Sequence, residues 1–445
     1  MEERIEKAPV VSEEKSQTKG NVWALLPILV FLVTYIGAGI IFNDFYKLSV
    51  VVAFMVAILV ACIQNRKLKF DDKLSVMAKG VADKNIVTMI LIFICAGIFG
   101  GTIGRDGATA VADLMLSFIP AQYSALVLFI VACFVSTAMG TSCGTITVIA
   151  PIGLAIATET GISPALITGS VIGGAMFGDN LSFISDTTIA ATSTQGCNMK
   201  DKFKENFFIA LPAALLTILA LLVFALTTNS VAPYTPGEIN LWLILPYVLV
   251  LIAGIAGVNV FIVLIGGIVS AIVVKLAVYG DIASIVASMG AGASGMFEVI
   301  LVTLLVSMLS ALMREYGGFD ALLYGIKKIY RGKVGGQLGI ATLVSAMDIA
   351  TANNTVAIVM SAPIAKQISE DYGITNTKTA SLLDIFGSVV QGIIPYGAQM
   401  ITAVSIVGVG AIELLPYLLY QYLLAISAIV AMFIPSLKRK KNDNQ

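Results

Sequence analysis

Residues 178–188 have the sequence Gly-Asp-Asn-Leu-Ser-Phe-Ile-Ser-Asp-Thr-Thr. They follow an apolar, glycine-dotted run, residues 165–177, that predicts a membrane helix. A charged side chain at membrane depth is costly, so Asp179 and Asp186 are candidates for a functional site. The glycine, asparagine and serines favour a break in the helix, and such a break is tolerated only beside a cavity or inside protein. The alternative is a plain helix end with both acids in water, but residues 189–191 are apolar again.

The composition indicates an integral membrane protein. Of the 445 residues, 58% are hydrophobic and 12% are charged, whereas soluble proteins carry about 25% charged residues. The mean hydropathy is +0.94. The 27 basic and 27 acidic residues balance, which argues neither for nor against a nucleic-acid partner, and we expect none. Histidine is absent, which excludes His-ligated metals, haem and His-based catalysis. A proton carrier would therefore be an acid or, less favourably, a lysine, tyrosine or cysteine.

The pattern of apolar runs predicts an all-α polytopic membrane protein. Runs approaching the roughly 20 residues that cross a bilayer occur near residues 22–42, 48–64, 86–104, 206–228, 240–257, 259–279, 296–313 and 414–435. Two regions differ, residues 121–195 and 337–411. Their apolar segments are shorter and are interrupted by glycine, proline, asparagine and threonine.

The chain contains an internal repeat. The sequence Asn-Val-Trp-Ala-Leu-Leu-Pro at residues 21–27 recurs as Asn-Leu-Trp-Leu-Ile-Leu-Pro at residues 240–246. Three further short sequence matches follow in the same order in both halves, and the offsets between matched residues are about 210 to 219. We therefore divide the chain into a cytoplasmic tail (1–20), a first repeat (21–228), a linker (229–239), a second repeat (240–435) and a basic cytoplasmic tail (436–445).

The distribution of basic residues predicts that the two repeats are inverted. Lysine and arginine gather in the loops 65–84, 198–205 and 327–333 and in the C-terminal tail, whereas the segments 229–238 and 280–295 contain none. Because basic loops face the cytoplasm, both termini are expected on the cytoplasmic side of a cytoplasmic (inner) membrane. The second repeat is then expected to cross the membrane in the opposite orientation to the first. Inverted repeats with discontinuous helices are typical of secondary transporters.

Each repeat is expected to hold a re-entrant hairpin followed by a broken transmembrane helix. The first hairpin enters over 121–138, turns at the tip 140–145 and returns over 146–158, opening to the outside. The second enters over 337–347, turns at 348–355 and returns over 356–367, opening inside. The breaks are expected at 178–188 and near 391–399. Asp179 and Gln391 are equivalent when Gly161 is matched to Gly373.

The polar residues of these tips and breaks suit a sodium ion, a hard cation that binds several oxygens. Helix ends add carbonyl dipoles with their negative ends toward a cation. The candidate ion- or substrate-binding residues are Thr141, Ser142, Gly144, Thr145, Asp179, Asn180, Ser182, Ser185, Asp186, Thr187, Asn353, Asn354, Thr355 and Gln391. Helix N-termini beyond the tips could instead hold an anionic substrate group.

Asp179 and Asp186 are the predicted Na⁺ ligands. A buried carboxylate can hold a proton or a cation, and that competition can produce ion/proton exchange. We assign Asp179 to the mid-membrane ion or substrate site and Asp186 to the competition between cation and proton. Asp348 and Asp384 are weaker candidates, each near an expected helix end. In the alternative, the tips are packing turns, the acids are structural, and residues 353–355 only cap a helix.

The central stretch resembles the G-D-x-x-S-P-x-S-D-T-T motif of NhaC-type sodium/proton antiporters. The match is specific over 178–188 and the preceding 169–177, and the tip 140–145 fits. It departs at Phe183, where the family usually has proline, and at 189–190, where Asn-Leu often follows. The resemblance implies a place in the ion-transporter superfamily, with scaffold and transport domains and elevator motion.

The resemblance implies sodium-linked Na⁺/H⁺ antiport, with Na⁺ and H⁺ as coupling ions and no other cofactor. Because the family also contains exchangers of sodium-lactate for malate and proteins proposed to carry amino acids, a transporter of a small organic solute is the alternative. The lipid bilayer is the expected surroundings, and a homodimer is left open. A channel or a membrane enzyme is disfavoured, since neither explains two inverted, broken-helix units.

Overall fold

The computed structural model describes residues 20–42, 48–183, 185–227, 239–256 and 258–433. Every regular element in these ranges is a helix, which confirms the predicted all-α class. The two expected tails and the linker lie almost wholly outside the described residues.

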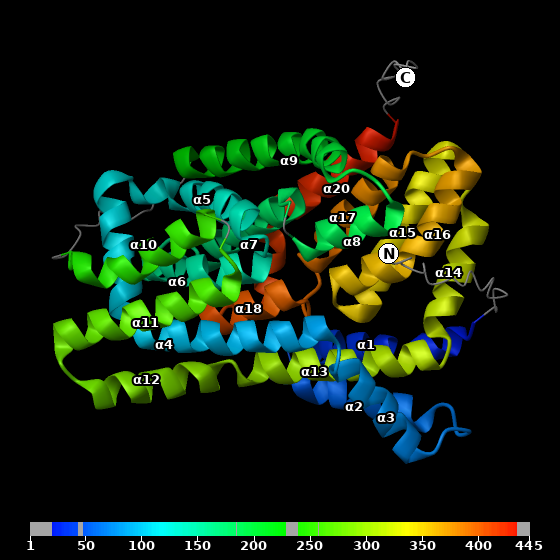
Figure 1. The fold of residues 1–445 in the computed structure, drawn as a ribbon, viewed down its shortest axis with the longest axis horizontal. Coiled ribbons are helices and arrows are strands. Elements are labelled where there is room, and N and C mark those ends of the chain that lie inside the picture. Colours follow the sequence, from blue (N-terminus) through cyan, green and yellow to red (C-terminus); the bar gives the residue numbers. More distant parts are fainter. Residues whose placement is uncertain (1–19, 43–47, 184, 228–238, 257, 434–445) are drawn as a thin grey trace, which may run out of the picture.

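The helices follow one another in the same order in the two halves of the chain (Figure 1). The first half contains η1 (Val22–Leu25), α1 (Leu26–Phe42), α2 (Val50–Ile63), α3 (Phe70–Val81), α4 (Lys84–Phe118), η2 (Ala121–Tyr123), α5 (Ser124–Met139), α6 (Ser142–Thr160), α7 (Pro164–Leu181), α8 (Asp186–Gln195) and α9 (Met199–Thr227). The second half contains α10 (Leu241–Ile255), α11 (Val260–Tyr279), α12 (Ile282–Gly295), α13 (Phe297–Glu315), α14 (Gly318–Ile329), α15 (Gly332–Thr351), α16 (Asn354–Tyr372), α17 (Asn376–Gln391), α18 (Ala398–Val407), α19 (Ala411–Leu414), η3 (Leu415–Tyr417) and α20 (Leu419–Phe433).

Each half contains one helix hairpin and one broken helix, as predicted. The hairpins are α5–α6 and α15–α16, and the broken helices are α7–α8 and α17–α18. Helix α4 is bent at Gly104, which has φ 68° and ψ −173°. Glycine reaches this conformation without the steric penalty of a side chain. The two parts of α4 therefore correspond in order to α13 and α14.

Helix α4 packs antiparallel to the α12–α13 pair along the long axis of the molecule (Figure 1). A Cβ added at Gly97 would lie 2.4 Å from the carbonyl oxygen of Gly292, and one added at Gly101 would lie 2.3 Å from that of Ser288. Numbering thus rises along α4 as it falls along α12. Glycine allows this close backbone contact, as it does in membrane helix packing. The α4 and α12–α13 segments, from different halves, therefore run in opposite directions, as inverted repeats require.

The outer surface of the helices is apolar, as in a protein that spans a membrane. The described part of the chain contains six helices long and apolar enough to cross a bilayer, or up to eight if each of two bent pairs is one span. On α11, Ile262, Val269 and Val273 are more than half exposed. A helix that is apolar on its exposed face as well as its buried face matches a lipid environment.

Segments that were expected to be loops contain helical residues. The basic segment 65–84 holds α3, the segment 280–295, which lacks lysine and arginine, holds α12, and 198–205 lies almost wholly in α9. In α3, Lys73 and Met77 lie one turn apart and are both buried. The Lys73 amine donates to the carbonyl oxygens of Cys62, at 2.6 Å, and Gln64, at 3.2 Å. A basic residue therefore caps the end of α2 instead of facing water.

Candidate functional site

The tip of the first hairpin is a two-residue turn between α5 and α6. Gly140 is in the left-handed region, with φ 67°, where a residue without a side chain is least strained. The Thr141 hydroxyl then accepts a hydrogen bond from the amide of Gly144 at 3.4 Å and caps α6. The tip is therefore shorter than the predicted 140–145, because Ser142 already belongs to α6. The positive end of the α6 dipole and the Ser142 hydroxyl face the centre of the molecule.

The tip of the second hairpin has the same construction. Ala352 adopts a left-handed conformation with φ 48°, which is unfavourable for a residue with a Cβ. The Asn353 side chain accepts a hydrogen bond from the amide of Val356 at 3.0 Å and caps α16. This tip too is shorter than the predicted 348–355. The N-terminus of a second helix is thereby brought to the centre.

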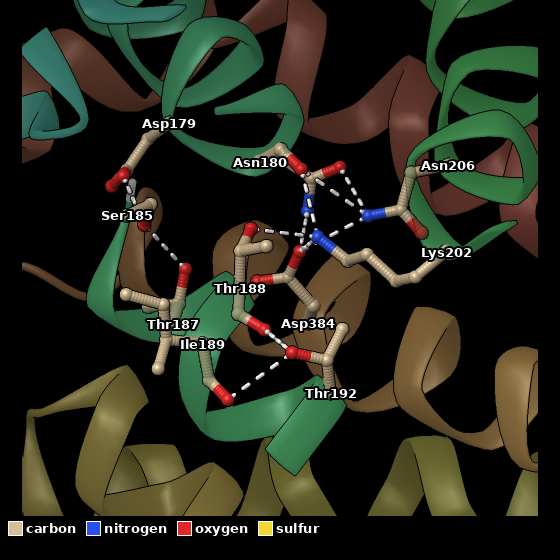
Figure 2. Close-up of polar contacts among 10 residues, drawn as sticks. All are labelled: Asp179, Asn180, Ser185, Thr187, Thr188, Ile189, Thr192, Lys202, Asn206 and Asp384. Carbon is tan, nitrogen blue, oxygen red and sulfur yellow. Dashed lines mark hydrogen bonds and ion pairs between the residues drawn. The ribbon is translucent and has the colours of Figure 1, made fainter. Parts of the chain in front are cut away.

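Asp179 lies in the last turn of α7 and is held by hydroxyl groups on both sides. Its Oδ2 accepts from the Ser142 hydroxyl of the first hairpin tip, and its Oδ1 accepts from the Ser185 hydroxyl beyond the helix break, each at 2.7 Å. The Ser185 contact is drawn in Figure 2. Asp179 is 7% exposed. The buried carboxylate therefore joins the end of α7, the start of α8 and the α6 N-terminus.

Asp186 is the first residue of α8, where the helix dipole favours a negative charge. Its Oδ2 accepts from the Thr355 hydroxyl of the second hairpin at 3.1 Å. Unlike Asp179, Asp186 is exposed. The two acids thus lie on opposite sides of one break, and each is bound by a hydroxyl from a different hairpin tip.

Two glutamines connect the hairpin tips. Gln391, the last residue of α17, donates from Nε2 to the carbonyl oxygen of Ala352 at 3.3 Å and to Oε1 of Gln399 at 2.9 Å. Gln399 in turn donates from Nε2 to the Ser142 hydroxyl at 2.9 Å. A hydrogen-bond chain therefore runs from the second tip across the α17–α18 break to the first tip, and through Ser142 to Asp179.

One cavity of about 440 Å³ lies between the two tips and the two breaks. Nine of the predicted site residues line it: Thr141, Ser142, Asp179, Asp186, Thr187, Asn353, Asn354, Thr355 and Gln391. Lys84, Thr88 and Phe93 line it from one face of α4. Lys84 and Asn259 are exposed members of this lining, so they mark where the cavity meets the surface.

The other five predicted site residues are not part of this lining. Gly144, Thr145 and Ser182 are buried, and Ser185 acts on the cavity only through its bonds to Asp179 and Thr187. Asn180 points away from the cavity, into a separate polar cluster with Lys202 and Asp384 (Figure 2).

Asp348 and Asp384 are both fully buried and outside the cavity lining. The expectation that Asp384 lies near a helix end is wrong, because it lies in the middle of α17. It pairs there with Lys202. Lys202 was expected in a basic loop at the surface, but it is in α9 and is 1% exposed. Charge counting along the sequence missed this because the partner of Lys202 is 182 residues away.

Gln399 and Lys84 are cavity residues that the sequence analysis did not select. Gln399 stands inside the predicted break at 391–399, so its position in an interrupted helix is the signal that could have identified it. Lys84 was counted only as part of the basic segment 65–84. Its place at the first turn of α4 becomes informative only when α4 is known to pass beside both tips.

Secondary transporters bind substrates and coupling ions at discontinuous helices near the middle of the membrane, and here two carboxylates lie at such a break beside two hairpin tips. The fold and the cavity place this chain in that class. The chain belongs to the Na⁺/H⁺ antiporter family, whose sequence model matches residues 2–226 and 225–435.

Related proteins cover most of the chain. The Na⁺/H⁺ antiporter NhaC of Bacillus subtilis is 24% identical over 80% of this chain and 86% of its own length. The malate-2H⁺/Na⁺-lactate antiporter of the same organism is 21% identical over 88% of this chain and 91% of its own. Among solved structures, the YdaH transporter of Alcanivorax borkumensis is 13% identical and aligns with a TM-score of 0.41 over 79% of this chain and 89% of its own.

Proposed function

We propose that this protein exchanges Na⁺ for H⁺, and that Asp179 and Asp186 form the site where the two ions compete. The observation that supports this most directly is the pairing of the acids with the tips. Two carboxylates from either side of one helix break enter one cavity, and each is oriented by a hydroxyl from a different hairpin. Each carboxylate has further lone pairs for a cation.

The charges around the cavity favour a cation. Two acids line it, and Lys84 at the exposed end is the one base in the described lining. Asp179 accepts from Ser142 in the first turn of α6, Asp186 accepts from Thr355 in the first turn of α16, and Asp186 itself begins α8. The positive ends of these helix dipoles favour a negative charge on Asp179 and Asp186. They therefore act on carboxylates of the protein and are not left free to bind an anionic substrate.

The different exposure of the two acids changes their proposed roles. Removing an isolated carboxylate from water costs free energy, and either a proton or a cation offsets that cost. Asp179 is the buried acid, so we assign the competition between Na⁺ and H⁺ to Asp179 instead of Asp186. The exposed Asp186 then receives the ion where the cavity meets the surface and helps to pass it to Asp179.

We propose that the protein lies in the cytoplasmic membrane, with both termini and the basic segments on the cytoplasmic side. Lys84 is the last residue of the basic segment 65–84, which contains α3, and it lies at the exposed end of the cavity. By the rule that basic segments remain inside, the cavity then opens toward the cytoplasm.

Transport in vesicles tests the proposal. Purified protein in liposomes with an acidic interior should release protons when Na⁺ is added outside, and Asp179→Asn with Asp186→Asn should abolish this. Asp281→Asn is the matched control, because Asp281 caps α12 outside the cavity and asparagine caps a helix equally well. Normal Na⁺-driven proton release by the double variant would refute the assignment of the site.

The pH dependence gives a second test of the same site. Because a proton and Na⁺ compete for Asp179, acidic pH should raise the Na⁺ concentration for half-maximal transport by about tenfold per pH unit where the proton is bound. Asp186→Asn should keep this dependence while weakening Na⁺ binding. If Asp186→Asn made Na⁺ half-saturation independent of pH, the proton would compete at Asp186, as the sequence analysis assumed.

A second candidate function is exchange of a small carboxylate coupled to Na⁺ or H⁺. The cavity volume of about 440 Å³ favours it, because this is within the range of small-molecule sites and exceeds what one Na⁺ needs. Lys84 could neutralise a carboxylate there. Counterflow of labelled malate or lactate in the same liposomes decides between the two, since a pure Na⁺/H⁺ exchanger would leave both solutes outside.

A further inference from the structure

Behind the α7–α8 break lies a second polar cluster, separate from the cavity (Figure 2). Helix α9 supplies Lys202 and Asn206, which are one helical turn apart and are 1% and 0% exposed. Asp384 of α17 is 1% exposed. A buried lysine is costly unless it is paired and fully hydrogen-bonded, so the surroundings of this amine must meet both needs.

The Lys202 amine bridges the break. It donates to the carbonyl oxygen of Asn180 at 3.0 Å, near the end of α7, and to the Thr188 hydroxyl at 2.8 Å, in the first turn of α8. Its third partner is the Asp384 carboxylate, with which it forms an ion pair. An ammonium group has three protons to donate, and all three have an acceptor here.

The groups around the amine are those of a cation site. One carboxylate, one backbone carbonyl at a helix break and one hydroxyl contact it directly, and such groups coordinate Na⁺ in transporters with broken helices. Asn206 binds Asn180 Oδ1 and Asp384 Oδ2, each at 3.0 Å. Asp384 Oδ1 and Asn206 Oδ1 are buried without a hydrogen-bond partner, so the cluster has more oxygen acceptors than protein donors.

We propose that the Lys202 ammonium is a built-in cation, which occupies an oxygen-lined site across the α7–α8 break and holds the break closed as a bound monovalent cation would. Asn180, which it holds, is the neighbour of Asp179, so the amine also positions the buried acid of the cavity. This last step rests on the proposed function, whereas the cation site itself does not.

The site can be tested by emptying it. Lys202→Ala leaves Asp384 and the carbonyl of Asn180 around a vacant space, and a small free cation should enter it. The thermal unfolding midpoint of this variant should fall, and then recover by several degrees in methylammonium or Na⁺ but not in choline chloride at equal ionic strength. Combining Lys202→Ala with Asp179→Asn and Asp186→Asn removes any contribution of the cavity to this recovery.

Two controls separate a cation site from a general effect of salt. Lys378 forms an ion pair with Glu205 at 2.9 Å, and it also joins α17 to α9, but Glu205 is 38% exposed. Lys378→Ala should therefore show no recovery that depends on the cation. Adding Asp384→Asn to Lys202→Ala removes the charge that attracts the cation and should abolish the recovery. Equal recovery in choline, or undiminished recovery without Asp384, would overturn the proposal.

The double variant also covers the case in which Lys202→Ala does not fold. Removing both members of a buried ion pair is far less destabilising than removing one, so Lys202→Ala with Asp384→Asn should remain folded. Its transport should fall about tenfold, or about 1.4 kcal/mol, because nothing then holds the break. Wild-type transport by this variant would show that the pair does not position Asp179. If the wild-type protein moved no Na⁺, the proposed function would fail, but the thermal recovery would stand.

Discussion

At the scale of single residues, the Ser142 hydroxyl of α6 is bonded to side chains of both α7 and α18. It donates to Asp179 and accepts from Gln399. Ser142→Ala should raise the Na⁺ concentration for half-maximal transport by about tenfold or more, because a hydrogen bond to a charged group contributes about 1.5–3 kcal/mol. Transport in liposomes at varied Na⁺ concentration measures this.

Ser170→Ala is the matched control for this substitution. Ser170 is buried on α7, the helix that carries Asp179, but its hydroxyl bonds only within the helix, to the carbonyl oxygen of Leu166 at 2.9 Å. It should transport Na⁺ with wild-type half-saturation. An unchanged half-saturation for Ser142→Ala as well would mean that the first tip is a packing turn, the alternative raised by the sequence.

Nine residues of the cavity lining could be predicted, because polar side chains interrupt apolar segments there and are costly in such surroundings. The sequence could not show which way each side chain faces. Asn180 follows Asp179 directly, yet it turns to the Lys202 cluster because adjacent residues of a helix point to different sides. Gln399 was not selected because its partner, Ser142, is 257 residues away.

At the scale of helices, the position of Asp179 depends on close packing between α7 and α5. A Cβ added at Gly178 would lie 2.5 Å from the carbonyl oxygen of Cys133 and 2.5 Å from Ser136 Cβ. Gly178→Ala should therefore push the end of α7 from α5 and destabilise the protein by about 1–3 kcal/mol. It should also lower the transport rate, because the next residue is Asp179. Thermal unfolding and Na⁺ transport measure the two effects.

Gly266→Ala provides the comparison. An added Cβ at Gly266 meets no atom within 4 Å, and alanine favours a helix more than glycine does. Its stability should be equal to or above that of the wild type. If Gly178→Ala were equally well tolerated, the contact between α5 and α7 would not fix the position of Asp179.

The helices themselves were predictable where long apolar runs coincide with the thickness of a membrane. The exceptions are instructive. Helix α3 is short and carries two acidic and two basic residues, and Lys73 joins it to the end of α2. Helix α12 lies in a segment rich in glycine and alanine, and it is held against α4 by backbone contact. Neither the Lys73 contact of α3 nor the glycine contact of α12 can be recognised from a long apolar run in the sequence.

At the scale of the whole molecule, the fold predicts which segments share a side of the membrane. Helix α3 and the start of α12 lie at opposite ends of the long axis (Figure 1). Single cysteines at the exposed positions Lys69 and Ser284, in a protein with its own five cysteines replaced, should react with an impermeant reagent from opposite faces of intact cells and inverted vesicles. Reaction of both positions from one face would contradict the inverted arrangement.

The repeat and its inversion could be anticipated from matching heptapeptides and the placement of basic residues. Which tip residue contacts which acid could not, because it depends on helix packing that brings Asp186 and Thr355 together across 169 residues. Only the folded structure shows that each hairpin tip donates a hydrogen bond to a different acid of the same helix break.

The glycine contact between α4 and α12 has a mechanical consequence. Backbone touches backbone at Gly97 and Gly101, so sliding α4 along α12 by even one residue would drive a Cβ into a carbonyl group. This face of α4 is therefore stiff. The opposite situation holds at Gly100, where an added Cβ meets nothing within 4 Å and a cavity of about 320 Å³ separates α4 from Thr147 and Pro151 of α6. The first hairpin thus faces this part of α4 across a gap, whereas α4 and α12 are in direct backbone contact.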